Sequence, residues 1–418
     1  MSMLLFRRKK LLIYTLLNLI IAPSFAQFQA DHFIEKLLKK HPDKFSKVLD
    51  NPDKYQVQIL YTRIDRNKKN EPHFTTHGYR VNSSEYFYPA STVKLPAVAL
   101  AFEKLNKLGI DKYTTMLTGA DRPEQTKVTS DTTAENGMPS VAHYAKKILL
   151  ASDNDAFNRL YEFIGQQELN DSLQKKGYLG TRIVHRLESP IGPENNRYTN
   201  PIRFEKDGKV VFDQPAQFNS KEYKSSAQVL KGNGYLKDGQ LVNEPFDFSQ
   251  KNAFPLEDQH RLLKALFFPD QVPASQRFYL TSDDYQFLYQ YMSQFPVETD
   301  FPANYTDDFY DGYVKFLMFG ATKTRLPRHI RLFNKSGDAY GFLLDNAYIA
   351  DFEKGIEFML TAVIYCNEDQ IFNDDKYEYE TIGLPFLADL GKTIFEYELG
   401  RKRAVRPDLN RFEVKYDK

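Results

Sequence analysis

Tryptophan is absent from this 418-residue sequence, cysteine occurs once, and neither sign of charge is in excess. The single cysteine, Cys366, excludes an intrachain disulfide, so the fold depends on a hydrophobic core that a chain of this length can supply. Its apolar neighbours, residues 360–365, predict a buried strand and a packed, unreactive thiol. With 56 basic and 55 acidic residues, the chain has no electrostatic footprint for nucleic acid.

Repeats, low-complexity segments and a glycine-rich phosphate loop are also missing from the sequence. His73 and His77 lie four residues apart on a strand-like segment, but no third ligand accompanies them, which favours surface histidines over a metal site. We therefore expect neither a metal ion nor any other cofactor.

The N-terminus has the pattern of a targeting segment. Residues 7–10 are all basic, and residues 11–22 form an apolar run that is too short to span a bilayer comfortably. Small residues at Ser24 and Ala26 suit cleavage after Ala26. We predict a signal peptide over residues 1–26, removed on export, with an uncleaved anchor as the alternative.

Hydrophobic spacing predicts an α+β fold. The expected elements are a helix over 31–48, paired strands over 55–65 and 73–82, helices over 91–108 and 138–150, short β-runs with turns within 202–255, helices over 256–267 and 283–293, strands over 330–333, 342–352 and 358–366, and a helix over 384–399. We expect the terminal strands to form one antiparallel sheet flanked by the terminal helices, and the middle to form an all-helical lobe. A site is expected in the groove between them. The folded domain would cover residues 27–400, with 202–255 inserted and 401–418 as a charged tail.

Three short motifs carry the chemistry. They are Ser91-Thr92-Val93-Lys94, Ser152-Asp153-Asn154 and Lys335-Ser336-Gly337. Ser91 opens a predicted helix, whose positive N-terminal field favours a developing alkoxide. Lys94 follows one turn later, about 4.5 Å along the axis, so its amine can reach the Ser91 hydroxyl. Alone, Lys94 would be interpreted as a solvated surface lysine; the order and spacing of all three motifs favour a serine acyl-transfer enzyme.

This set resembles the penicillin-recognising serine hydrolases. Residues 138–160, which include Ser152-Asp153-Asn154 and Asn158, look like the helix and S-D-N loop of class A β-lactamases, and the interval from Ser91 to Ser152 also fits. The resemblance covers most of residues 50–400 and implies the β-lactamase/transpeptidase-like fold.

The resemblance also implies roles for individual residues. Ser152 would relay a proton to the leaving nitrogen, and Asn154 would hold the amide of the substrate. Lys335 and Ser336 would hold a substrate carboxylate, and the backbone N–H of Asp338 would join that of Ser91 in an oxyanion hole.

Glu188 is the candidate for activating the deacylating water. Arg186-Leu187-Glu188 falls where the family carries R-x-E, but Gly192 stands where the family has an asparagine. Asn195 and Asn196 come later, and the alternative for Glu188 is a surface carboxylate paired with Arg186. Whether Lys94 alone, or Glu188 through a water, takes the serine proton is disputed for the family.

The resemblance implies an exported bacterial enzyme, periplasmic or secreted, that acts on a β-lactam through a Ser91 acyl-enzyme. The same motifs would serve a D-alanyl-D-alanine carboxypeptidase or transpeptidase acting on cell-wall peptides, and a non-catalytic binding protein could share the fold. No stable membrane insertion is expected after signal cleavage. Segment 202–255 is longer than in the family and could be a lid or a passive elaboration.

Overall fold

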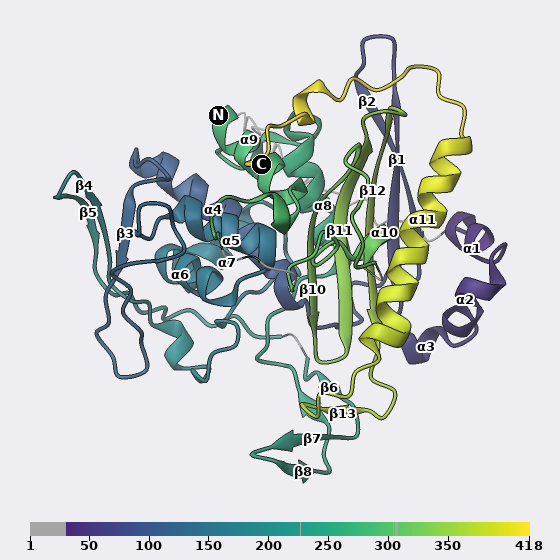
Figure 1. Ribbon diagram of the computed structural model, residues 1–418. Helices are drawn as coiled ribbons and strands as arrows, with labels where there is room; N and C mark the ends of the chain where they lie inside the picture. The colour runs from purple at the N-terminus through teal and green to yellow at the C-terminus, as the bar shows by residue number, and fades with distance from the viewer. Residues whose placement is uncertain (1–30, 226, 304, 306–307, 321) are drawn as a thin grey trace, which may run out of the picture.

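The computed structural model describes residues 31–225, 227–303, 305, 308–320 and 322–418, so the predicted signal peptide lies outside the described residues. Two lobes are seen, a sheet with helices on both faces and a lobe built around a central helix (Figure 1). In the described part of the chain, no helix combines the length and apolarity needed to cross a membrane.

The main sheet confirms the prediction that strands from the beginning and from the end of the chain pair in one antiparallel sheet. Its five strands are β1 (Gln58–Arg66), β2 (Pro72–Tyr79), β10 (Ile330–Ala339), β11 (Phe342–Asp351) and β12 (Ile356–Tyr365). They are antiparallel in the order β10-β11-β12-β1-β2, which leaves β10 at the edge beside the other lobe. Every residue of β11 and β12 is buried because helices cover both faces of the sheet.

Terminal helices cover one face, as predicted (Figure 1). They are α1 (Phe33–Leu38), α2 (Pro42–Leu49), α3 (Pro52–Tyr55) and α11 (Leu384–Gly400). The prediction of one helix over 31–48 was wrong, because the chain breaks between Leu38 and Pro42. Proline lacks the N–H that a helix interior needs but suits a first helical position, so Pro42 starts a new helix.

The other lobe is helical at its centre. Its helices are α4 (Lys94–Leu108), α5 (Val141–Ala151), α6 (Asn154–Ile164) and α7 (Gln166–Lys175). Residues 94–105 of α4 are all buried, because α5, α6 and α7 surround this helix. Two further helices, α8 (Leu256–Phe267) and α9 (Ser282–Ser293), pack against the second face of the sheet and join the lobes in one core.

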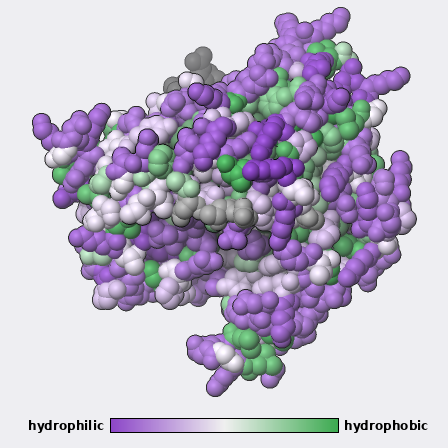
Figure 2. Space-filling view, viewed as in Figure 1, coloured by the Kyte–Doolittle hydropathy of each residue, from purple (hydrophilic) through white to green (hydrophobic). Residues whose placement is uncertain are grey.

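Small sheets lie at the periphery of both lobes (Figure 1). They contain β3 (Thr115–Thr118), β4 (Ile202–Lys206), β5 (Lys209–Gln214), β6 (Leu230–Lys231), β7 (Gly234–Lys237), β8 (Gln240–Val242), β9 (Phe246–Asp247) and β13 (Ile371–Phe372). The predicted turns at 206–209 and 237–240 are two-residue hairpins whose central residues all have positive φ, as such hairpins require. The hairpins project from the body, and apolar side chains show on the β7–β8 arm, where Leu241 is exposed (Figure 2).

Short helical turns connect these elements. They are α10 (Phe316–Phe319), η1 (Ala90–Val93), η2 (Asn195–Arg197), η3 (Pro269–Gln271), η4 (Ala274–Gln276), η5 (Pro296–Glu298), η6 (Tyr379–Gly383) and η7 (Asn410–Phe412). The chain after α11 returns across the top of the sheet to α9 (Figure 1). There Phe412 is buried against Phe267 and Tyr348, and Asp417 forms an ion pair with Lys146 at 2.6 Å.

Candidate active site

Ser91 lies in η1, at the head of the buried helix α4, where the edge strand β10 passes close to it. Ala90, immediately before it, has a φ of +45°, a conformation that costs free energy in a non-glycine residue and is often found at functional sites. Gly337 of β10 makes the approach possible, since a Cβ there would lie 2.6 Å from the Ser91 backbone nitrogen. Among the described residues, nothing accepts a hydrogen bond from that nitrogen. The geometry therefore leaves a backbone donor beside the predicted nucleophile.

Lys94 is placed to receive a proton from Ser91. Its Nζ lies 2.8 Å from Ser91 Oγ and 3.1 Å from Ser152 Oγ, and it also donates to the Ser152 carbonyl. The side chain is 0% exposed. Burial lowers the pKa of Lys94 well below its ordinary value, and the nearby charge of Lys335 lowers it further. An amine that loses its proton this readily can act as a general base.

Ser152 connects two lysines. It ends α5 in a left-handed conformation with a φ of +59°, as predicted for a turn after that helix, and Ser140 caps the helix start. Its Oγ accepts from Lys335 Nζ at 2.8 Å as well as from Lys94. The hydroxyl therefore lies between the two amines, where it can pass a proton.

Asn154 follows directly as the first residue of α6, which Asp153 caps through a 2.7 Å bond to the Ala156 nitrogen. The Asn154 side chain is half-buried. No described residue makes a hydrogen bond to its amide, which leaves both its donor and its acceptor available to a ligand.

Lys335 lies within β10 and is 2% exposed. Burial lowers its pKa to about 7, against the opposing charges of Asp345 and Asp338. Ser336 is also buried, whereas Asp338 is exposed. Lys335, Ser336 and Gly337 thus lie in the middle of a longer strand than the sequence predicted, with β11 behind them.

A buried polar network beneath β10 escaped the sequence reasoning. Lys315 Nζ donates to Asn334 Oδ1 at 2.8 Å, and Asn334 Nδ2 donates to Asp345 Oδ1 at 2.7 Å. Burial lowers the pKa of Lys315 to about 7 and raises that of Asp345 to about 6. Asn334 directly precedes Lys335, so the network holds the strand that carries it. A lysine and an aspartate inside two otherwise apolar stretches were the available signal.

The loop that carries Glu188 is held at its base. Asn158 accepts from the Leu187 nitrogen at 2.8 Å and donates to the Leu187 carbonyl at 2.9 Å. Arg186 is buried and pairs with Glu162 at 3.0 Å. The alternative in which Arg186 pairs with Glu188 was therefore wrong, because the guanidinium points into the helical lobe.

Glu188 itself is exposed, with a φ of +45°, and no described residue forms an ion pair or hydrogen bond with its carboxylate. Its negative charge nevertheless raises the pKa of Lys94 against the effect of burial, so the carboxylate lies within electrostatic range of the centre. Asn196 is buried and bonds to Arg186 and to the carbonyls of Ile191 and Gly192. That asparagine supports the loop backbone and leaves Glu188 without an amide partner.

The inserted segment reaches the chain just before Ser91. Phe248 packs on Tyr88, with ring centres 6.3 Å apart, and on Tyr340, at 5.4 Å. Tyr88 and Tyr340 also contact each other at 4.9 Å. This aromatic cluster supports the loop that leads into η1 from the side of β6–β9.

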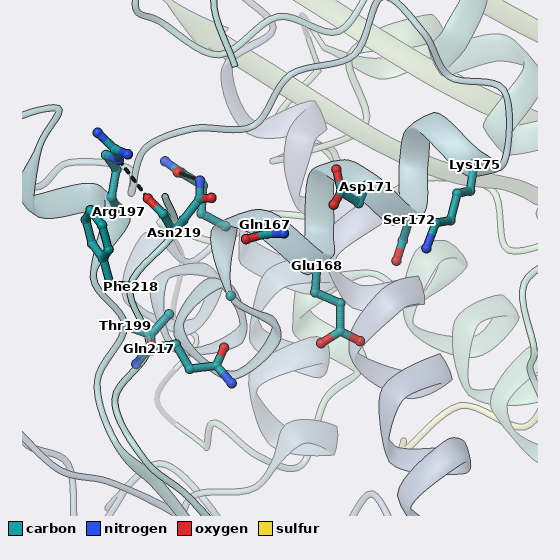
Figure 3. A pocket seen from close by; sticks show the side chains of 12 residues that line it. Gln167, Glu168, Asp171, Ser172, Lys175, Arg197, Thr199, Gln217, Phe218 and Asn219 are labelled. Atoms are coloured by element: carbon teal, nitrogen blue, oxygen red, sulfur yellow. Dashed lines mark hydrogen bonds between the residues drawn. The ribbon is translucent and has the colours of Figure 1, made fainter. Parts of the chain in front are cut away.

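A separate cavity of about 540 Å³ lies between α7 and residues 197–219 (Figure 3). None of the predicted site residues lines it. Glu168 and Asp171, which line it, pair with Lys104 and Lys221. The cavity therefore does not belong to the catalytic centre.

A metal centre finds no support in the described part of the chain, where no three His, Cys, Asp or Glu side chains are grouped to hold an ion. Cys366 is buried, and burial raises the pKa of its thiol. The chemistry available is that of a serine, two lysines of lowered pKa and a nearby carboxylate.

Comparison with known proteins gives a family match over most of the chain. The profile described as "Beta-lactamase enzyme family" matches residues 43–397. A search of curated proteins gives no match. Three solved structures are similar over most of the chain. They are the chromosome-encoded β-lactamase of Vibrio parahaemolyticus (15% identity, TM-score 0.47, 84% of this chain and 97% of that chain), a β-lactamase from Burkholderia phymatum (14%, 0.46, 86% and 98%) and one from Sphaerobacter thermophilus (13%, 0.45, 85% and 98%).

Proposed function

Because the chain belongs to the beta-lactamase enzyme family, we propose that it is an exported serine hydrolase, closest to class A, that hydrolyses β-lactams through an acyl-enzyme on Ser91. One observation carries this proposal: Lys94 Nζ lies 2.8 Å from Ser91 Oγ and 3.1 Å from Ser152 Oγ. The proposed base is thus in contact with both the proposed nucleophile and the proposed proton relay before substrate binds.

Acylation follows from these contacts. Ser91 Oγ attacks the amide carbonyl carbon while its proton passes to Lys94 Nζ. The backbone N–H groups of Ser91 and Asp338 donate hydrogen bonds to the oxyanion that forms. The C–N bond then breaks, and the leaving nitrogen takes the Ser152 hydroxyl proton, which Lys94 replaces.

Binding uses the neighbouring side chains. The Lys335 ammonium and the Ser336 hydroxyl hold a substrate carboxylate, and the free amide of Asn154 holds the substrate's amide. Substrate binding also favours the protonated form of Lys335, because an anion beside an amine raises its pKa.

Deacylation is assigned to Glu188. Its carboxylate takes a proton from a water molecule whose oxygen adds to the acyl carbon, and the ester bond to Ser91 Oγ breaks as Oγ regains a proton. Residues 1–26 would direct the enzyme to the periplasm or to the medium of a bacterium. Residues 27–400 would form the mature catalytic domain together with the tail over 401–418, whose Phe412 is buried in the core.

A D-alanyl-D-alanine peptidase or transpeptidase is the second candidate. It is favoured by the exposure of Glu188 and by the commitment of Asn196 to the loop, since both weaken the case for a rapidly positioned water. The two candidates share every acylation step and differ in the lifetime of the acyl-enzyme.

Intact-protein mass spectrometry during incubation with a penicillin tests the proposal. A transient adduct on Ser91 is the result expected of a β-lactamase. A persistent adduct supports the peptidase, and no adduct means a binding protein or an unrelated substrate.

A further inference from the structure

Asp338 stands at the rim of the catalytic centre. It directly follows Gly337, whose Cα is so close to η1 that a Cβ there would lie 2.6 Å from the Ser91 nitrogen and 3.1 Å from the Thr92 nitrogen. The Asp338 side chain is exposed, although the two residues before it are buried. Lys94, which bonds to Ser91 Oγ, lies within electrostatic range of the Asp338 carboxylate, so a group bonded to Ser91 lies near that charge.

The Asp338 carboxylate has no counter-charge of its own. No described residue gives it an ion pair or a hydrogen bond. Lys335 and Lys94 are the cations within electrostatic range, but burial lowers the pKa of both, that of Lys335 to about 7. Burial raises the pKa of Asp338, the charges of Lys335 and Lys94 oppose that rise, and the negative charge of Glu188 adds to it. Two carboxylates that no described residue pairs, Asp338 and Glu188, therefore lie near each other at the rim of the centre.

Strand geometry places this charge near the carboxylate-binding position. Side chains alternate along a strand, so Ser336 and Asp338 project on the same side of β10, about 7 Å apart. A substrate carboxylate at Ser336 would be repelled by Asp338 unless a positive charge accompanied it.

Aromatic rings near Asp338 also favour a ligand group with a positive charge. Burial raises the pKa of the Tyr313 hydroxyl, and the charges of Asp338 and Glu188 add to that rise, so Tyr313 lies within electrostatic range of both carboxylates. Its ring contacts that of Phe309, with ring centres 4.9 Å apart. Carboxylates together with aromatic faces are the groups that bind organic cations.

We propose that Asp338 determines specificity, selecting acyl substrates that carry a positive charge close to the carboxylate on the leaving-group side of the scissile amide. This inference rests on the proposed function of Ser91 and Lys335. It predicts a preference for zwitterionic over purely anionic substrates.

A matched pair of cephalosporins tests it. Cephaloridine and cephalothin share one acyl side chain and one carboxylate, but cephaloridine carries a pyridinium where cephalothin carries a neutral acetoxymethyl group. The ratio of kcat/KM for cephaloridine to that for cephalothin should fall about tenfold in Asp338→Asn, because the attraction is lost while the side-chain size is kept. Asp308→Asn, an exposed aspartate near Tyr313 but off the strand, is the control and should change the ratio little.

Each outcome has a distinct meaning. An unchanged ratio in Asp338→Asn overturns the proposal, and so does a loss of kcat/KM confined to cephalothin, because that loss raises the ratio. If the variant fails to fold, the unmodified protein provides the test. Added salt must then lower the ratio of kcat/KM for cephaloridine to that for cephalothin, because salt screens an electrostatic attraction. Absence of a Ser91 adduct with both compounds overturns the proposed function, and the specificity with it.

Discussion

The acylation centre and the loop that carries Glu188 are built in different ways. Lys94 and Lys335 are buried and both bond to Ser152, which joins residues from α4, from the end of α5 and from β10. The loop has an equally buried base, where Arg186 pairs with Glu162, but the Glu188 carboxylate is exposed and unpaired among the described residues. Under the proposed function, the groups for acylation are preorganised, whereas side-chain contacts do not fix the position of the group proposed for deacylation.

The difference teaches that the side chains for two steps of one reaction need not be equally fixed in position before substrate binds. A buried, cross-linked set of polar groups loses little free energy to reorganisation when substrate arrives. A free carboxylate on a turn with positive φ must be oriented by substrate or water. We expect mutations to separate the two steps cleanly.

The largest effect is expected at Ser91. Ser91→Ala removes the hydroxyl that we propose as the nucleophile, so covalent labelling by a β-lactam or a fluorophosphonate should be abolished while the fold remains. Ser152→Ala is the matched control, since it removes the other lysine-bound hydroxyl and should slow labelling without moving it. Labelling of Ser91→Ala at another residue would contradict the assignment. Intact-protein mass spectrometry measures labelling of the unmodified protein and of both variants.

The next largest effect separates the two regions. Glu188→Gln should slow deacylation by roughly 10²–10⁴-fold, the usual contribution of a general base, and leave acylation measurable. The acyl-enzyme of Glu188→Gln should accumulate in quenched reactions analysed by intact-protein mass spectrometry. Glu194→Gln, an exposed glutamate on the same loop, should leave both rates unchanged. If deacylation persists in Glu188→Gln, Glu188 is a surface carboxylate and the peptidase becomes the better function.

A smaller effect is expected at Lys335. A charge-assisted bond contributes roughly 1.5–3 kcal/mol, so Lys335→Ala should slow acylation by an anionic substrate by about one to two decades. Loss of equal size with a neutral ester would show that Lys335 acts in the chemistry instead of in anchoring.

The pH dependence of KM gives Lys335 a second test. Its pKa is lowered to about 7, so the ammonium is present below that pH and is lost as the pH rises through it. KM for an anionic substrate should therefore rise above pH 7 in the unmodified protein and stay flat in Lys335→Ala. A rise of equal size in both proteins would assign the titration to another group.

The smallest effect on acylation is expected at Asn196. Removing its side chain leaves Arg186 and the carbonyls of the loop without their partner, which should lower the free energy of unfolding by about 1–3 kcal/mol. Deacylation should slow more than acylation, because only the Glu188 loop is disturbed. Urea unfolding measures the loss of stability. Asn195→Ala is the control, because among the described residues the Asn195 side chain bonds to Arg122 and not to the loop backbone. Equal loss of both rates would contradict separate support of the two regions.

Much of this arrangement could be predicted because it is local. The helix start at Ser91, the cap at Ser140 and the turn at Ser152 depend on residues within a few positions, and hairpin turns depend on Asp-Gly pairs. The split at Pro42 is equally local, because a proline that starts a new helix outweighs the apolar spacing on its two sides.

The remainder depends on tertiary contacts. The bond between Lys335 and Ser152 joins residues far apart in the chain, so spacing could not predict it. The resemblance to a family assigned both residues to one site but not to this contact. The partner of Arg186 was misassigned because sequence proximity favoured Glu188, whereas burial favoured Glu162. The Lys315, Asn334 and Asp345 network was missed because each residue forms its contacts only after the lobes pack.

The place of β1 in the sheet has a consequence for biosynthesis. Gln58 pairs with Val363, so a strand from the start of the chain has β12, from near its end, as one of its two neighbours. A ribosome releasing this chain exposes β1 and β2 as a lone hairpin, which is marginally stable in water. Closing so long a loop slows the search for the native pairing and leaves an apolar strand uncovered meanwhile. The nascent chain should therefore stay open to proteases and chaperones until β12 emerges.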